Sequence, residues 1–159
     1  MLGAEERYAE LAGRYKTRIA AVSRRLPGDP DGRTFLAIMP LDQIRTLNGA
    51  GALMQVMHDL GYRLPDWIAE RGGREFSVAF SPEELPQLDA DLVLLVAPFG
   101  AADQSPEAAR DALSALMPGW DRFLPAAREE RLVHIPGRIA IVATFSAAHE
   151  ILDVIGRQL

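Results

Sequence analysis

Apolar residues at the start of the chain recur every three or four positions, as on one face of an amphipathic helix. They are Tyr8, Leu11, Tyr15, Ile19, Val22 and Leu26. The pattern predicts a helix over residues 4–26, about 35 Å long at the usual rise per residue. A Pro-Gly-Asp-Pro run at 27–30 ends it. Such a helix is long for a domain of this size, so we expect part of it to overhang the rest.

Three apolar runs predict buried strands, at residues 34–39, 91–97 and 131–135. The run at 91–97 is uninterrupted, as in parallel strands that are covered on both faces. Residues 62–80 between the first two runs read as a loop-rich stretch.

Further helices are predicted between and after these strands. Asn48-Gly49-Ala50-Gly51 leads into an apolar helix that ends at Gly61, and residues 148–159 repeat an apolar stripe. Ser-Pro-Glu sequences at 81–83 and 105–107 each start a helix, and Glu84 is placed to form a capping box with Ser81. Alternating strands and helices predict an α/β fold, a three-layer α/β/α lobe with a mainly parallel sheet.

Composition excludes several classes of function. The 159 residues are 48% hydrophobic and 25% charged, the mix of an ordinary globular domain. The net charge of −5 and the scattered arginines argue against a nucleic-acid surface. The chain has no cysteine, which excludes disulfides, zinc–thiolate sites and thiol catalysis. No apolar run approaches the roughly 20 residues that span a bilayer, and the N-terminus does not resemble a signal peptide.

The residues that most often carry catalysis show no catalytic spacing. His58, His134 and His149 have no serine or carboxylate at a triad or metal-site spacing, and we expect a protein that is not an enzyme and has no metal site of its own. Gly49 and Gly51 lack the third glycine of a dinucleotide fingerprint. They either hold an anion at the helix N-terminus or allow tight packing of loop against helix.

Three segments in order resemble the C-terminal half of class III periplasmic binding proteins, the siderophore, haem and cobalamin binders. One is the Ser-Pro-Glu-Glu-Leu segment at 81–85 that runs into Leu-Asp-Ala-Asp-Leu-Val at 88–93; another is Gly-Trp-Asp-Arg-Phe-Leu-Pro-Ala-Ala at 119–127, continuing to Val133; the third is the glycine-led helix at 49–61. The resemblance implies that residues 1–27 form a long inter-lobe helix and residues 28–159 the C-terminal lobe. The N-terminal lobe and the signal peptide are then expected upstream of Met1.

The same resemblance implies the substrate-binding component of an ABC importer, which captures a ferric siderophore or related iron chelate outside the cytoplasmic membrane. Its partners are then a membrane permease and the chelate, with no cofactor. Alternatives are a cobalamin or haem carrier of the same family and a stand-alone cytoplasmic flavodoxin-like domain. Full-length members of the family are periplasmic or anchored as lipoproteins.

Five residues are candidates for contact with the ligand. Arg45 and Arg138 are expected in loops after the first and third strands, where ligands of open parallel sheets collect and a guanidinium can bind anionic oxygens. Phe76, Ser77 and Phe99 stand where the family lines this lobe's wall, and only the two phenylalanines keep aromatic character. No Tyr or His stands clearly at a pocket loop, which leaves haem unsupported.

Two further expectations concern surfaces. The family docks on its permease through one exposed glutamate per lobe, and Glu83 is the matching residue here; the alternative is an acidic residue that only favours the helix N-terminus. The apolar stripe of residues 4–20 is expected to self-associate in the isolated fragment.

Overall fold

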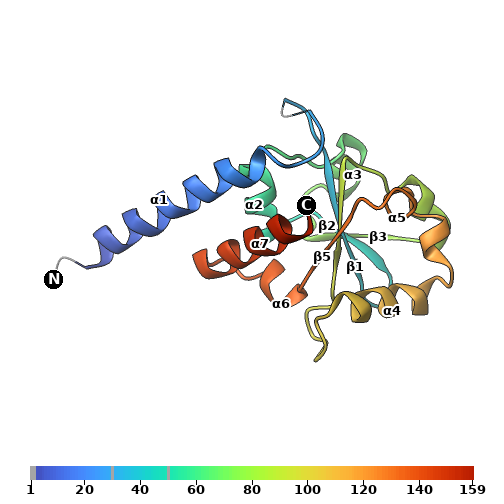
Figure 1. Cartoon of the computed structure of the whole chain (residues 1–159). Coiled ribbons are helices and arrows are strands. Elements are labelled where there is room, and N and C mark those ends of the chain that lie inside the picture. The colour runs from blue at the N-terminus through green and yellow to red at the C-terminus, as the bar shows by residue number, and fades with distance from the viewer. Residues whose placement is uncertain (1–2, 30, 50) are drawn as a thin grey trace.

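The centre of the molecule is a five-stranded sheet in the order β3-β2-β1-β4-β5 (Figure 1). The computed structural model describes residues 3–29, 31–49 and 51–159. Met1, Leu2, Pro30 and Ala50, which belong to the predicted N-terminus, helix stop and glycine loop, lie outside the described residues. The strands are β1 (Phe35–Pro40), β2 (Ile44–Leu47), β3 (Ser77–Phe80), β4 (Leu92–Val96) and β5 (Leu132–Ile135).

The three predicted strands are confirmed and pair in parallel. Ile38 of β1 lies beside Leu95 of β4, which lies beside His134 of β5. β2 is antiparallel to both of its neighbours, β1 and the edge strand β3, so the sheet is mixed. The loop-rich stretch predicted at residues 62–80 contains α3 (Asp66–Gly72) and β3, and the loop expected around Arg45 is the strand β2. These predictions were wrong because elements of four to seven residues are too short to give a clear periodicity.

Helices cover both faces of the sheet, which confirms the three-layer architecture. One face packs on α2, α6 and α7, with part of α1 above them, and the other packs on α3, α4, α5 and the 3₁₀ helices η1 and η2. The central strands β1 and β4 are buried along their whole length, as expected for strands covered on both faces. The helices are α1 (Ala4–Ser23), α2 (Ala52–Asp59), α3 (Asp66–Gly72), η1 (Pro82–Gln87), α4 (Pro106–Leu116), η2 (Trp120–Arg122), α5 (Pro125–Arg128), α6 (Gly137–Ala140) and α7 (Phe145–Gln158).

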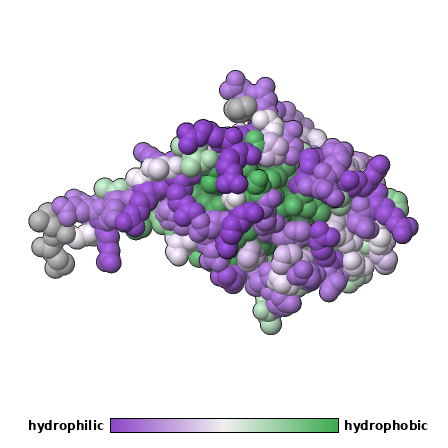
Figure 2. All heavy atoms as spheres, viewed as in Figure 1, coloured by the Kyte–Doolittle hydropathy of each residue, from purple (hydrophilic) through white to green (hydrophobic). Residues whose placement is uncertain are grey.

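The long first helix projects from the body of the molecule, as the sequence predicted (Figure 1). Its C-terminal half contributes Tyr15, Ile19 and Val22, which pack partly buried against the core. Its N-terminal half does not: Tyr8 is 62% exposed and Leu11 is exposed too. The projecting part is mostly hydrophilic on the side seen in Figure 2, whereas apolar residues show at the centre of the molecule.

A buried arginine fixes the base of α1. The Arg33 guanidinium donates to the Ser23 hydroxyl at 2.6 Å, to the Ser23 carbonyl at 3.3 Å and to the Leu60 carbonyl, and it lies over the Tyr62 ring at 4.7 Å. Tyr62 in turn donates to the Pro27 carbonyl at 2.6 Å. The end of α1 is thus tied to the end of α2.

The Ser-Pro-Glu-Glu start at residue 81 forms the predicted capping box, with Glu84 accepting from the Ser81 backbone N–H at 2.9 Å. The helix that follows is a short 3₁₀ helix, η1, and Pro86 inside it prevents continuation as an α-helix. Glu84 also accepts from Arg71 at 2.5 Å, and this ion pair lowers the pKa of the Glu84 carboxyl to about 2.

Candidate ligand-binding site

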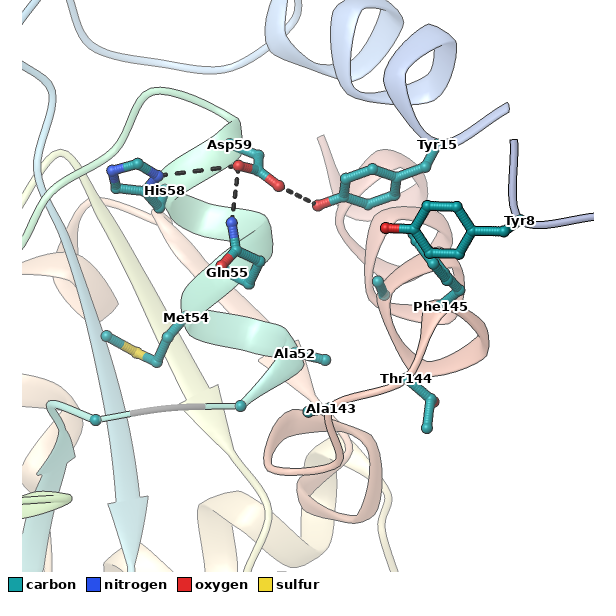
Figure 3. Close-up of a pocket in the computed structure, with 13 residues that line it drawn as sticks. Tyr8, Tyr15, Ala52, Met54, Gln55, His58, Asp59, Ala143, Thr144 and Phe145 are labelled. Carbon is teal, nitrogen blue, oxygen red and sulfur yellow. Dashed lines mark hydrogen bonds and ion pairs between the residues drawn. The ribbon is translucent and has the colours of Figure 1, made fainter. Parts of the chain in front are cut away.

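A cavity of about 760 Å³ opens between the projecting helix α1, the length of α2 and the N-terminal end of α7 (Figure 3). Its walls come from segments far apart in the sequence. They are Tyr8 and Tyr15 of α1; Gly49, Gly51, Ala52, Met54, Gln55, His58 and Asp59 in and before α2; and Ala143, Thr144, Phe145 and Ala148 at the start of α7.

Aromatic rings form one side of this cavity. The Tyr8 and Phe145 ring centroids are 5.5 Å apart, those of Tyr15 and Phe145 6.1 Å, and both pairs meet edge to face. Tyr15 also meets the His149 ring edge-on at 5.9 Å. Such perpendicular pairs are the favoured arrangement of aromatic quadrupoles and hold the rings in defined orientations.

A carboxylate forms the opposite side. Asp59 accepts a hydrogen bond from the Tyr15 hydroxyl at 2.8 Å and one from the Gln55 side-chain amide at 2.9 Å. Burial and the neighbouring Asp59 raise the pKa of the Tyr15 phenol, which therefore stays neutral and remains a donor. The His58 Nδ1 lies 3.9 Å from Asp59. The Tyr15–Asp59 bond joins α1 to α2 across the cavity.

The first residues of α2 and α7 also line the cavity. The Thr144 hydroxyl accepts from the Ala147 backbone N–H at 3.1 Å, which caps α7 and leaves Phe145 at its first turn. Gly51 before α2 has φ +129°, and a Cβ there would lie 2.9 Å from the Ala140 carbonyl oxygen. This contact supports the packing interpretation of the glycines over the anion site.

Arg45 does not lie in the predicted loop but within β2, opposite Met39 of β1. Its guanidinium donates to Asp42 at 3.2 Å and to the Ser77 hydroxyl at 3.3 Å. The structure therefore brings the candidates Arg45 and Ser77 together, at the antiparallel edge of the sheet, and neither lines the cavity.

Phe76 adjoins the cavity. Its carbonyl accepts from the backbone N–H groups of Asn48 and Gly49, at 2.8 and 3.0 Å, and its side chain is 47% exposed. A Cβ on Gly49 would lie 2.9 Å from the Phe76 ring. The glycine thus allows this exposed aromatic ring to sit against the loop that begins the cavity wall.

Phe99 and Arg138 form a separate pair of candidates after β4 and β5. The backbone of Phe99 touches Gly137, and its side chain is 50% exposed. Arg138 lies in the short helix α6 rather than in an irregular loop, and its guanidinium donates to Glu150 of α7 at 2.6 Å. Its backbone N–H donates to the Gln104 side chain at 3.0 Å.

Glu83 is exposed in the first turn of η1, beside the capping box that engages Glu84. Because Arg71 and the Ser81 backbone occupy Glu84, the two adjacent glutamates have different environments. This agrees with the expected division of roles, in which Glu84 stabilises the helix start and Glu83 points outward.

The three histidines are not brought together. His134 accepts from Arg110 at 3.1 Å, and burial followed by Arg110 lowers its pKa. Burial, with Arg18 and Arg14 nearby, lowers the pKa of His149. Across residues 3–29, 31–49 and 51–159 no cluster of His, Cys, Asp and Glu could hold a metal ion. The same residues include no helix that is long and apolar enough to cross a membrane.

The sequence did not reveal that Tyr15, Asp59 and Phe145 share one cavity. Tyr15 was predicted only as part of an apolar stripe, and Asp59 was not among the candidate residues. The expectation for Tyr and His concerned pocket loops, whereas Tyr8, Tyr15 and His58 line the cavity from the helices α1 and α2. No local spacing could signal this, because Tyr15 and Asp59 are 44 residues apart.

Neither the protein-family models nor the curated proteins give a match to this chain. Solved structures do. They include SirA of Staphylococcus aureus (17% identity, TM-score 0.73, 99% of this chain and 60% of that chain). They also include a FhuD fold-family periplasmic binding protein component of a Fep/Fec-like ferrichrome ABC transporter from Bacillus subtilis (14% identity, TM-score 0.76, 98% of this chain and 58% of that chain).

A third match is the siderophore periplasmic binding protein from the fuscachelin gene cluster of Thermobifida fusca (22% identity, TM-score 0.68, 99% of this chain and 55% of that chain). At such identities the likeness shows the fold, and it confirms the predicted resemblance at that level. The Bacillus subtilis and Thermobifida fusca structures are described as binding proteins, not enzymes. The chain spans between 55% and 60% of the length of the three.

Proposed function

We propose that this chain is the C-terminal lobe of the substrate-binding component of an ABC importer, which captures a ferric siderophore or related iron chelate. The fold supports this, because similar structures bind siderophores and belong to ferrichrome-type ABC transporters. A stand-alone flavodoxin-like domain is not favoured, since that fold has an all-parallel sheet and in this one β2 runs antiparallel to both of its neighbours.

The observation that carries the proposal is the cavity beneath the projecting half of α1. A ligand held there would meet α1, α2 and α7 of this lobe, and α1 extends beyond the lobe with its Tyr8 side chain exposed. A second lobe outside residues 1–159 would supply the opposite wall and cover the free half of α1. The protein would then bind by enclosure between two lobes, which removes most of a ligand's surface from water.

The candidate residues take different places in this proposal. Phe76 extends the cavity wall beside Gly49. Phe99 follows β4 and Arg138 lies in α6 after β5, whereas Arg45 of β2 is bonded to Ser77 of the edge strand β3. Arg45 is paired with Asp42 and Arg138 with Glu150, and each guanidinium keeps further N–H donors that would contact an anionic ligand group.

We propose that Glu83 docks the loaded protein on its permease outside the cytoplasmic membrane. An exposed carboxylate at the start of η1, free of the capping box, can pair with an arginine of the permease. The capping box holds the helix start in place and so fixes the direction in which Glu83 is presented.

A binding panel on the full-length protein, expressed from its complete reading frame, tests the proposal. Isothermal titration against ferric trihydroxamates, ferric catecholates, haem and cobalamin should show tight binding of an iron chelate and weaker binding of the other two. Residues 1–159 alone should bind the same chelate weakly or not at all, because one wall is missing. Tight binding of haem or cobalamin instead would assign one of the alternative carriers, and no binding of any compound would refute the proposal.

A further inference from the structure

The charges around the cavity point to the sign of the ligand's charge. Among the described residues that line it, Asp59 supplies a carboxylate, and there is no lysine or arginine. Although Asp59 accepts hydrogen bonds from Tyr15 and Gln55, both donors are neutral. The basic side chain beside it in the described cavity wall is His58, whose Nδ1 lies 3.9 Å away and which is positive only when protonated.

Three arginines on neighbouring helices are each paired with a carboxylate. Arg14 pairs with Glu10 at 2.7 Å along α1, Arg18 pairs with Asp153 of α7, and Arg138 pairs with Glu150. These pairs offset the positive charge that would otherwise face the cavity. The environment thus differs from the anion-binding site that the sequence suggested for this lobe.

The aromatic side of the cavity adds a second, independent attraction for a cation. Tyr8, Tyr15 and Phe145 meet at near-perpendicular angles, with interplanar angles of 71° and 68° about Phe145. Aromatic faces carry negative potential and attract an ammonium group within about 6 Å of the ring centroid. Figure 3 shows the three rings gathered on the α1 and α7 side, with Asp59 approaching from α2.

We propose that the corner formed by Tyr8, Tyr15, Phe145 and Asp59 receives a positively charged ammonium group of the ligand. The carboxylate would pair with the ammonium, and the faces of the aromatic rings would contact the ammonium and exclude water. The inference rests on the proposed function in one respect, namely that the ligand which carries the ammonium is the captured chelate. The substrate class is then an iron chelate with a free amine, such as a linear ferric trihydroxamate.

The test compares two probes that differ only in this group: a linear ferric trihydroxamate with a free terminal amine, and the same chelate with that amine acetylated. Both are titrated into the full-length protein at low ionic strength. The amine form should bind roughly ten-fold more tightly, as expected for a partly desolvated cation between a carboxylate and aromatic rings. Asp59→Asn should abolish most of this preference.

The acetylated chelate is also the control for folding, because its affinity should be the same in wild type and in Asp59→Asn. Asp111→Asn, at an exposed position of α4, is the matched control and should keep the full preference. Equal affinity for the two chelates in the wild type would overturn the ammonium site and leave the proposed function standing. If neither chelate binds but another iron chelate does, the ammonium site is again overturned; if no iron chelate binds at all, both proposals fail.

Discussion

Replacing the buried Arg33 with methionine should loosen the base of α1 and lower the stability of the whole lobe. Arg33 is only 2% exposed, and its guanidinium reaches Ser23 at the end of α1 and the Leu60 carbonyl at the end of α2. A hydrogen bond from a charged donor contributes about 1.5–3 kcal/mol net. Methionine keeps much of the volume and the contact with Tyr62, but it leaves these acceptors unsatisfied.

The variant loses the three hydrogen bonds of the guanidinium, but it also removes the desolvation cost of a buried charge. The two effects on the free energy of unfolding therefore partly cancel. We expect the free energy of unfolding to fall by about 2–4 kcal/mol. Urea denaturation followed by circular dichroism measures it, and hydrogen exchange should show faster exchange along α1 than in β4. Arg74→Met, at an exposed site, should change stability by less than about 0.5 kcal/mol. A loss below about 1 kcal/mol for Arg33→Met would refute the view that this residue anchors α1.

Three other predictions concern stability and association. The folded-state pKa of Glu84 is depressed from 4.5 to about 2, so its contribution to stability is present above pH 4.5 and is lost as the pH falls through about 2. The melting temperature of wild type should therefore exceed that of Glu84→Gln near neutral pH and converge with it in acid; a constant difference would contradict this. Gly137→Ala should lower the free energy of unfolding by about 1–3 kcal/mol, because a Cβ there collides with the backbone after β4. An unchanged urea midpoint would contradict this. Residues 1–159 should self-associate through the exposed half of α1, and Tyr8→Ser with Leu11→Ser should give a monomer by analytical ultracentrifugation. A wild-type fragment that is strictly monomeric at high concentration would count against this surface.

Much of the fold could be predicted because its central elements have strong local signals. The continuous apolar runs gave β1, β4 and β5, and the 3.6-residue period gave α1 with its overhang. The capping signature at Ser81 was also sufficient to predict the helix start. The short strands β2 and β3 gave no such signal, since a strand of four residues shows little periodicity.

The site could be predicted less well, because its residues meet only through tertiary packing. Arg45 was assigned to a loop since β2 was not predicted, and it lies in a strand paired with Asp42 and Ser77. Asp59 and Phe145 come from the end of one helix and the start of another, and only the packing of α2 on α7 brings them to one cavity. Spacing along the chain carries no information about such a contact.

Uptake of radiolabelled iron by living cells tests the central claim most directly. Deletion of the gene should abolish uptake of the chelate that the full-length protein binds, and the wild-type gene should restore it. A gene carrying Glu83→Arg should not restore uptake, although the purified variant binds the chelate with unchanged affinity, since a like charge would then face the permease. Glu83→Arg that restores full uptake would contradict the docking residue. Undiminished uptake of the bound chelate after deletion would contradict the assignment of this protein to an iron-chelate importer.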